Sequence, residues 1–207
     1  MPIDQEVKTR ILEQAREQFL KLGFSKVTMN EIADDLGMSK KTLYEYFSSK
    51  ETLLMDAMTS MQIEATNNIS KLVSDESLDF VQKLQLIMTE GARFHSKFSN
   101  HFWIDLQRNA PAIWKRCDDF RLEKMRKTTS LIVREGIRKK FFRSDIDEQV
   151  VVLMYMTTVQ NLMTPEVLTQ LPVTMQQLFE NIIRIIFEGI LSEDARARRV
   201  ASVLTSA

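Results

Sequence analysis

Residues 28–53 read TMNEIADDLGMSKKTLYEYFSSKETL, and the spacing of polar and apolar residues in this stretch predicts how it folds. Thr28 and Glu31 have the spacing of a capping box, which opens a helix. Gly37 follows at a point where the chain must turn sharply, and glycine tolerates the left-handed backbone of such a turn. Ser39 is then suited to cap a second short helix. The stretch therefore predicts two short helices joined by a tight turn.

These two helices meet the requirements of a helix-turn-helix. A close helix crossing needs a small side chain, which Ala33 supplies. The apolar residues that would hold the second helix against the first are Ile32, Leu36, Met38, Leu43 and Phe47. The opposite face of the second helix is left polar for the major groove of a duplex, by Lys40, Lys41, Thr42, Tyr44 and Tyr46.

Longer helices are predicted on both sides of this unit. Apolar residues recur at helical spacing over residues 4–22, and Gly23 suits the end of that helix. Ser48 and Glu51 have the spacing of a second capping box, which predicts a helix over about 49–70.

The rest of the chain also has the pattern of helices. Five glycines and four prolines in 207 residues are too few for the turns of a β-sandwich or barrel. The further predicted helices cover about residues 80–94, 101–108, 111–142, 147–163 (capped by Asp145) and 174–191, with a frayed or loosely helical tail from Ser192 to Ala207. The predicted fold is all-α, with about nine helices.

Composition limits the function. With 28 Lys or Arg against 28 Asp or Glu, the chain is not a generally cationic protein that grips any polyanion. The single cysteine, Cys117, excludes an internal disulfide and is typical of a reducing cytosol. No apolar run approaches 18 residues, and residues 1–10 lack the apolar core of a signal peptide. We expect a cytoplasmic protein without a membrane span.

Motifs of common enzyme and metal sites are missing from the sequence. It contains no G-x-G-x-x-G, G-x-x-x-x-G-K-[ST], H-E-x-x-H or G-x-S-x-G. His95, His101 and Cys117 do not make a zinc shell, and each histidine is interpreted as a partly buried or surface imidazole. We therefore expect no catalytic residues, no metal and no cofactor.

The segments 28–33, 37–47 and 49–53 together resemble the TetR family of bacterial transcriptional repressors. The pattern T-L-Y-x-Y-F-x-x-K at 42–50 is highly specific. The resemblance covers about the first 55 residues, and the remainder is similar only in the number and length of its helices. It implies a helix-turn-helix DNA-binding domain over residues 1–50 and an effector-binding and dimerisation domain over 51–207. The implied mechanism is a homodimer on a palindromic operator in double-stranded DNA, released by a small molecule.

The resemblance also implies which residues approach DNA. Lys41 departs from the family pattern, in which a small residue is common. Tyr44 has an alternative interpretation as a core aromatic packed against the first helix. The predicted DNA-binding residues are Lys26, Thr28, Asn30, Lys40, Lys41, Thr42, Tyr44, Tyr46 and Lys50, the last of which would grip phosphate.

Aromatic and sulfur-containing residues gather in the middle of the chain. Such a group indicates either a pocket for a largely apolar effector or the core of a helical bundle. Spacing alone favours the core, and the pocket is what the resemblance implies. The candidate pocket residues are Phe94, Phe98, Phe102, Trp103, Trp114, Cys117, Met125 and Tyr155.

Two segments, 147–163 and 174–191, are apolar on more than one side and must be covered on more than one side. Pairing them with their copies in a second subunit would cover them. The segment 115–143 contains eleven Lys or Arg and only four Asp or Glu. This excess of positive charge indicates a solvated helix face, a contact with DNA or a site for an anionic effector.

The sequence thus favours a dimeric, effector-responsive repressor. Two alternatives remain open: an all-α small-molecule-binding protein or enzyme with a vestigial DNA-binding domain, and a purely structural helical adaptor.

Overall fold

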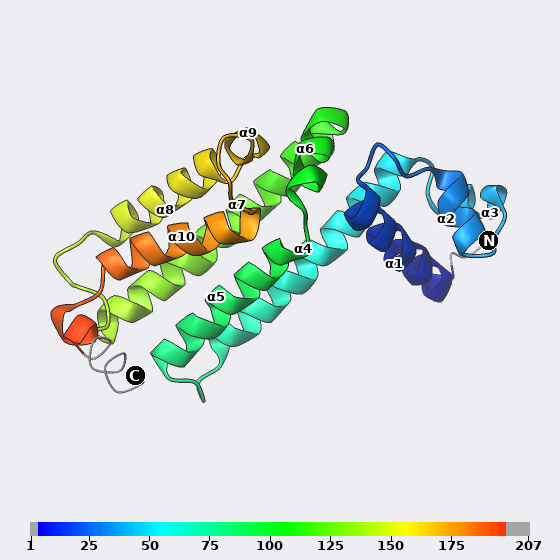
Figure 1. Cartoon of the computed structure of the whole chain (residues 1–207). Coiled ribbons are helices and arrows are strands. Elements are labelled where there is room, and N and C mark those ends of the chain that lie inside the picture. Colours follow the sequence, from blue (N-terminus) through cyan, green and yellow to red (C-terminus); the bar gives the residue numbers. More distant parts are fainter. Residues whose placement is uncertain (1–3, 198–207) are drawn as a thin grey trace, which may run out of the picture.

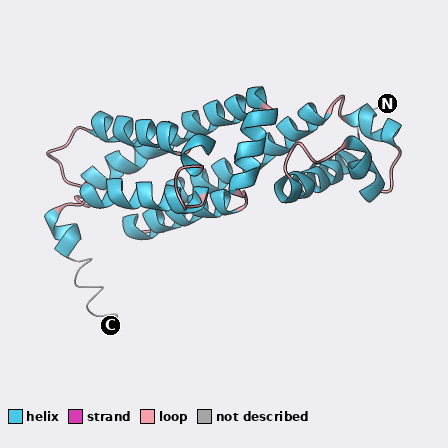
Figure 2. Cartoon of the chain, turned by 45° about the horizontal axis from the view of Figure 1, so that its top comes forward, coloured by secondary structure: helices cyan, strands magenta, loops and turns pink. Residues whose placement is uncertain are grey.

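The computed structural model describes residues 4–197 as an elongated, helical molecule (Figures 1 and 2), with no strand in that range. Three helices form one end, which we call the head, and the long helix α4 leaves it to join the remaining helices, which we call the body (Figure 1). The head holds α1 (Gln5–Leu22), α2 (Met29–Asp35) and α3 (Lys40–Tyr46). The body holds α4 (Lys50–Ser74), α5 (Phe80–Ser96), α6 (Asn100–Asn109), α7 (Pro111–Arg138), α8 (Glu148–Leu162), α9 (Pro165–Leu168) and α10 (Met175–Gly189). The predicted all-α fold is confirmed.

The helix-turn-helix forms as the sequence predicts. The Thr28 hydroxyl accepts from the Glu31 backbone N–H, and the Glu31 carboxylate accepts from the Thr28 backbone N–H at 2.8 Å, which completes the capping box. Gly37 has φ +63°. Ala33 and Leu43 are fully buried where α2 and α3 pack together. The turn and the crossing are therefore set by the residues that were identified for them.

Two predicted caps are wrong by one or two residues. The cap of α4 is Ser49, whose hydroxyl accepts from the Thr52 backbone N–H at 3.1 Å, so the box from Ser48 to Glu51 does not form. The cap of α8 is Asp147 and not Asp145. Neighbouring residues of the same chemistry compete for each cap, and Asp145 is held instead by an ion pair with Arg143.

The end of α7 also differs from the prediction, because the helix stops at Arg138 and not near 142. Lys140 adopts the left-handed conformation, with φ +58°. The Phe141 N–H bonds to the Gly136 carbonyl and the Lys140 N–H bonds to the Ile137 carbonyl, both at 2.9 Å, in the pattern of a Schellman motif. This turn carries the buried Phe142 into the core of the body.

Other boundaries shift less. Helix α4 continues to Ser74, and the short helix α9, which begins at Pro165, was not predicted. Residues 193–197 are helical, and the rest of the predicted frayed tail, 198–207, lies outside the described residues. None of the helices described between residues 4 and 197 is both long and apolar enough to cross a membrane.

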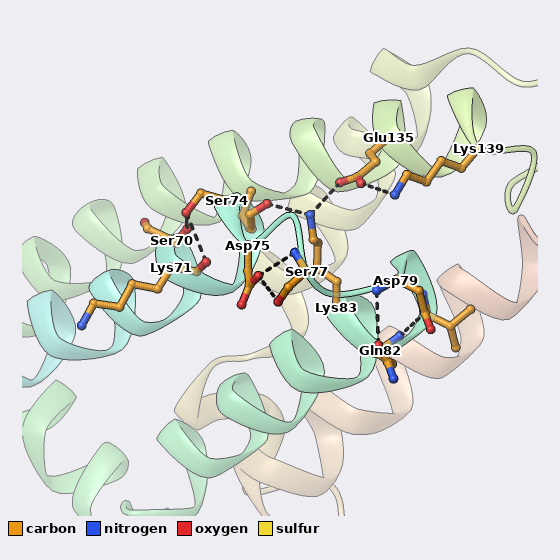
Figure 3. A network of polar contacts seen from close by, with 12 residues as sticks. Ser70, Lys71, Ser74, Asp75, Ser77, Asp79, Gln82, Lys83, Glu135 and Lys139 are labelled. Atoms are coloured by element: carbon orange, nitrogen blue, oxygen red, sulfur yellow. Dashed lines mark hydrogen bonds and ion pairs between the residues drawn. The ribbon is translucent and has the colours of Figure 1, made fainter.

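A buried lysine fixes the end of the body that lies away from the head (Figure 3). The Lys83 ammonium donates to the Val73 carbonyl at 2.9 Å and pairs with Glu135 at 3.5 Å. Glu135 also pairs with Lys139 at 3.0 Å. The network ties the end of α4, the start of α5 and the end of α7 together. The cavity described below therefore lies between helices that are joined at this end.

Candidate DNA-binding surface and internal cavity

Helix α3 presents one apolar and one polar face. Leu43 and Phe47 are buried against the rest of the head, while Lys40, Lys41 and Tyr44 are exposed. The Tyr44 side chain is 41% exposed, and the Lys40 ammonium lies 5.8 Å from the centre of its ring. The interpretation of Tyr44 as a core aromatic is therefore wrong.

The other predicted DNA-binding residues of the head differ in how exposed they are and in whether their side chains are already hydrogen-bonded. Lys26 and Asn30 are exposed. Thr28 is exposed too, but its hydroxyl donates to Glu31 at 2.7 Å. Thr42 is half-buried, with its hydroxyl 2.8 Å from that of Ser39, the cap of α3. Tyr46 is half-buried against the core.

Lys50 is engaged inside the protein. Its ammonium donates to the Phe24 and Val27 carbonyls, each at 2.9 Å, and lies 4.2 Å from the centre of the Phe24 ring. Two of its three N–H groups thus hold the loop between α1 and α2. This structural role was not predicted, and a phosphate contact from Lys50 remains a prediction.

Ion pairs join the head to α4. Lys8 pairs with Asp56 at 3.3 Å, and Arg16 pairs with Glu64 at 3.9 Å. Buried residues in the first turns of α4, Leu53 and Leu54 among them, share the core of the head. Helix α1 and the first half of α4 are thus held together by ion pairs and by a shared core.

The body encloses a cavity of about 130 Å³ between α4, α5 and α7, and we call it the main cavity. Tyr155 of α8 and Phe179 of α10 complete its wall. Most of its surface is apolar, with Ile69, Ile87 and Ile132 on the three principal helices. A cavity of this kind suits the apolar part of a small molecule.

Arg121 is the chief polar group of the main cavity. Its side chain is only 14% exposed and pairs with Asp118, one turn away on α7. The opposite side of the guanidinium, at Nη1, faces the sulfur atoms of Met125 and Met163 at 3.8 and 4.0 Å. Thioethers are weak acceptors, so this side of the guanidinium has hydrogen-bonding capacity to spare.

A second, smaller cavity of about 20 Å³ adjoins the first, and we call it the side cavity. Trp103 of α6 and Trp114 and Cys117 of α7 line it, and it shares Gln62, Phe94, His95 and Arg121 with the main cavity. The indole N–H of Trp103 is buried and has no hydrogen-bond partner among residues 4–197. Burial raises the pKa of the Cys117 thiol to about 11, so the thiol is protonated at neutral pH.

His95 lies between the two cavities, buried in α5. Its Nδ1 atom has no hydrogen-bond partner among the described residues, and the centre of its ring is 5.0 Å from that of the Phe179 ring. Burial, helped by the charge of Arg121, lowers the pKa of His95 to about 3, so the imidazole is neutral at physiological pH. Gln62 donates to the Cys117 carbonyl at 2.8 Å and so links α4 to α7 beside it.

The structure brings together part of the predicted pocket. Phe94, Met125 and Tyr155 line the main cavity, and Trp103, Trp114 and Cys117 line the side cavity. The prediction for Phe98 and Phe102 is corrected, because both are buried in the core and line neither cavity. Their rings contact each other and the ring of Trp103, tilted at Phe98 and edge-on between Phe102 and Trp103.

The polar lining of the cavities was not predicted from the sequence. Arg121 lies four residues after Cys117 and four before Met125, so all three share one face of α7. Helical spacing from the two predicted residues would have identified it. No comparable signal marks Gln62, because its helix reaches the cavity only through tertiary packing. Among the described residues, no cluster of three metal-ligating side chains occurs.

Helices α8 and α10 pack against each other and carry large apolar side chains on the surface. Leu153 is 64% exposed and Ile185 is 72% exposed. Val150 and Met154 lie beside Leu153 on one face of α8, at the spacing of neighbouring turns, and are exposed as well. Nothing within residues 4–197 covers the apolar surface of these two helices.

The sequence and the fold match known regulatory proteins. The model of a family described as bacterial regulatory proteins, tetR family, matches residues 11–57. The HTH-type transcriptional regulator YvaF of Bacillus subtilis (strain 168), itself uncharacterized, is 27% identical over 89% of this chain and 96% of its own.

Two solved structures share the fold and contain ligands. A regulator from Saccharomonospora viridis in complex with choline has a TM-score of 0.68 at 20% identity, over 92% of this chain and all of the other. The regulator FadR from Bacillus subtilis in complex with stearoyl-CoA has a TM-score of 0.61 at 17% identity, over 88% of this chain and 98% of the other. Their ligands differ in charge and size, so the shared fold does not indicate one ligand.

Proposed function

Because this chain belongs to the TetR family of bacterial transcriptional regulators and binds DNA through its helix-turn-helix, we propose that it is a ligand-responsive repressor. It acts in the cytoplasm as a homodimer on a palindromic operator, and a small effector in the main cavity releases it. We assign DNA binding to residues 1–50, and effector binding and dimerisation to residues 51–207.

The exposed polar face of α3 is the observation that carries the proposal. Lys40, Lys41 and Tyr44 project from a helix whose other face is fixed in the core. A rigid helix with basic and aromatic side chains on its free face suits the major groove. The nine proposed DNA contacts are those identified in the sequence, with Lys50 and Tyr46 the most constrained by packing.

Dimerisation rests on the uncovered apolar surface of α8 and α10. Pairing this surface with its copy by two-fold symmetry would bury Leu153 and Ile185 in an isologous four-helix contact. Two heads would then be presented to successive major grooves, which lie about 34–36 Å apart along the duplex.

Effector response rests on the cavities and on α4. This helix lines the main cavity through Gln62 and Ile69 and is joined to the head at its start. A ligand that fits one tilt of α4 better than another shifts the separation of the two recognition helices. The lining of the two cavities contains no arrangement on which we would base catalysis.

The test is selection of a binding duplex from a random library, followed by measurement of affinity by fluorescence anisotropy over a range of salt concentrations. We expect a palindromic consensus and a logarithmic salt slope of about −0.9 for each phosphate contacted. Lys41→Ala and Tyr44→Ala should weaken binding, whereas Lys71→Ala, an exposed lysine far along α4, should not. A folded protein that selects no duplex at low salt would refute the proposal and favour a binding protein or enzyme with a vestigial head.

A further inference from the structure

We propose that the effector is an anionic amphiphile, with one negatively charged, oxygen-rich head group held at Arg121 and an apolar body in the main cavity. This inference rests on the proposed function and adds the chemical class of the ligand. It comes from the charges, unmet hydrogen bonds and apolar walls of the two cavities.

The balance of charge around the two cavities favours an anionic ligand. Five of the eleven cations of the basic segment 115–143 have carboxylate partners at or near the surface. The pairs are Lys115 with Asp119, Lys127 with Glu123, Arg134 with Glu148, Lys139 with Glu135 and Arg143 with Asp145. These five cations are thus neutralised by neighbouring carboxylates, without DNA or a ligand.

Arg121 and Lys124 are different, because they line the main cavity. Arg121 pairs with Asp118, whereas Lys124 has no ion pair within the described part of the chain and lies 5.2 Å from the centre of the Phe120 ring. The two cavities are thus lined by two cations and one carboxylate. The remaining positive charge favours an anion and disfavours a cation, and partial burial strengthens that preference.

Two hydrogen-bond donors at the cavities have no oxygen acceptor among the described residues. Within the described part of the chain, Arg121 Nη1 faces only sulfur, and the Trp103 indole N–H is buried without a partner. Buried donors are costly when they are left unpaired, and a carboxylate or similar head group supplies the oxygen acceptors that these two lack. The side cavity, with about 20 Å³, has room for one small oxygen-bearing group or a water.

The wall of the main cavity is mostly apolar. The side chains of Ile69, Ile87 and Phe179 offer a small inorganic anion no polar group to bind. They suit a hydrocarbon or aromatic body. The charged and apolar parts of the ligand therefore have separate places, and both are needed for affinity.

The experiment is isothermal titration calorimetry of the full chain with three ligands of equal chain length: decanoate, 1-decanol and decyltrimethylammonium. We expect decanoate to bind at least about tenfold more tightly than the other two, because only its head group matches the positive charge. Equal or tighter binding of decyltrimethylammonium, or binding of none of the three, would overturn the proposal.

Variants locate the head group. Lys124→Gln should weaken decanoate binding about three- to tenfold and leave 1-decanol binding unchanged. Lys127→Gln removes the same charge from the exposed side of the same helix and is the matched control. Arg121→Gln should cause a larger loss, and Lys124→Gln preserves the test if Arg121→Gln does not fold. Decanoate affinity that is unchanged in Lys124→Gln would overturn the proposal.

Operator release, measured separately, distinguishes this inference from the proposed function. If decanoate binds with the expected preference but leaves DNA affinity unchanged, the ligand class stands and the ligand-responsive repressor fails. If decyltrimethylammonium releases the operator and decanoate does not, the repressor stands and the ligand class is overturned.

Discussion

The carboxylate of Asp105 accepts a hydrogen bond from the backbone N–H of Ser25 at 2.9 Å, between residues 80 positions apart in the chain. Asp105 lies on α6, and Ser25 lies in the loop between α1 and α2. Next to this contact, Gly23 has φ +89°, and a Cβ atom there would lie 2.8 Å from the Asp105 carboxylate, so only glycine fits. Trp103, two residues before Asp105, lines the side cavity. A single short helix therefore contacts both the side cavity and the head.

Replacing Asp105 should loosen the head. Burial raises the pKa of Asp105, but hydrogen bonds from Ser25 and Asn109 outweigh it and lower the pKa, so the group is ionised at neutral pH. We expect Asp105→Asn to lower the free energy of unfolding by about 1–3 kcal/mol in urea denaturation, because a charged acceptor is lost. Asp119→Asn, on the exposed face of α7, is the control. Equal stability of the two variants would contradict this role of Asp105.

Lys50 should contribute to stability as well as to any DNA contact. Lys50→Met keeps the apolar stem but leaves the Phe24 and Val27 carbonyls without their donor. We expect the free energy of unfolding to fall by about 1–3 kcal/mol. Lys26→Met, at an exposed position of the same loop, should change DNA affinity alone. A Lys50→Met protein that loses DNA affinity at unchanged melting temperature would show that Lys50 serves only the phosphate.

His95 should make the protein less stable in mild acid. Its pKa is lowered to about 3 by burial and by Arg121, whereas the unfolded chain takes up the proton near pH 6.5. The unfolded state therefore binds more protons between these values, and folding stability falls as the pH drops through this range. This group alone should lower the free energy of unfolding by about 2 kcal/mol between pH 7 and pH 5.

His95→Phe tests this dependence by urea denaturation at the two pH values. The variant should lose less stability than the parent protein between pH 7 and pH 5. His101→Phe, at an exposed position, should keep the parental dependence. If His95→Phe also keeps the parental pH dependence of stability, the buried imidazole is not the source of that dependence.

Lys140 should be replaceable by glycine with a gain in stability. It is the one described non-glycine residue with a positive φ, and the left-handed conformation costs a residue with a Cβ atom about 1–2 kcal/mol. Part of this gain is lost because glycine also raises the conformational entropy of the unfolded chain. We therefore expect the free energy of unfolding to rise by about 0.5–1 kcal/mol in Lys140→Gly. Lys139→Gly, at negative φ, should destabilise, and thermal melting of both variants checks the sign.

A charge in the apolar surface of α8 and α10 should separate the subunits. Ile185→Glu would bury a carboxylate in the proposed interface, and sedimentation velocity should then show a monomer where the parent protein is a dimer. Ile63→Glu, an exposed apolar position on α4, should leave the dimer intact. A parent protein that is monomeric at micromolar concentration would reject this interface.

The helix-turn-helix was predictable because its causes are local. The Thr28 cap acts on a residue three positions away, the Gly37 turn needs one backbone conformation, and Leu43 follows the period of its own helix. None of these depends on the distant chain. The caps of α4 and α8 were less certain for the same local reason, because equivalent serines or aspartates stood side by side.

The cavities depend on contacts between residues far apart in the chain. Phe98 and Phe102 have the composition of a pocket wall but fill the core, while Gln62 and His95 reach the cavities because α4, α5 and α7 leave a gap between them. Lys50 turns inward only because the Phe24 carbonyl lies within its reach. Periodicity tells which residues of a helix share a face, but the neighbours of that face follow from how the helices cross, and that arrangement arises only when the whole chain has packed.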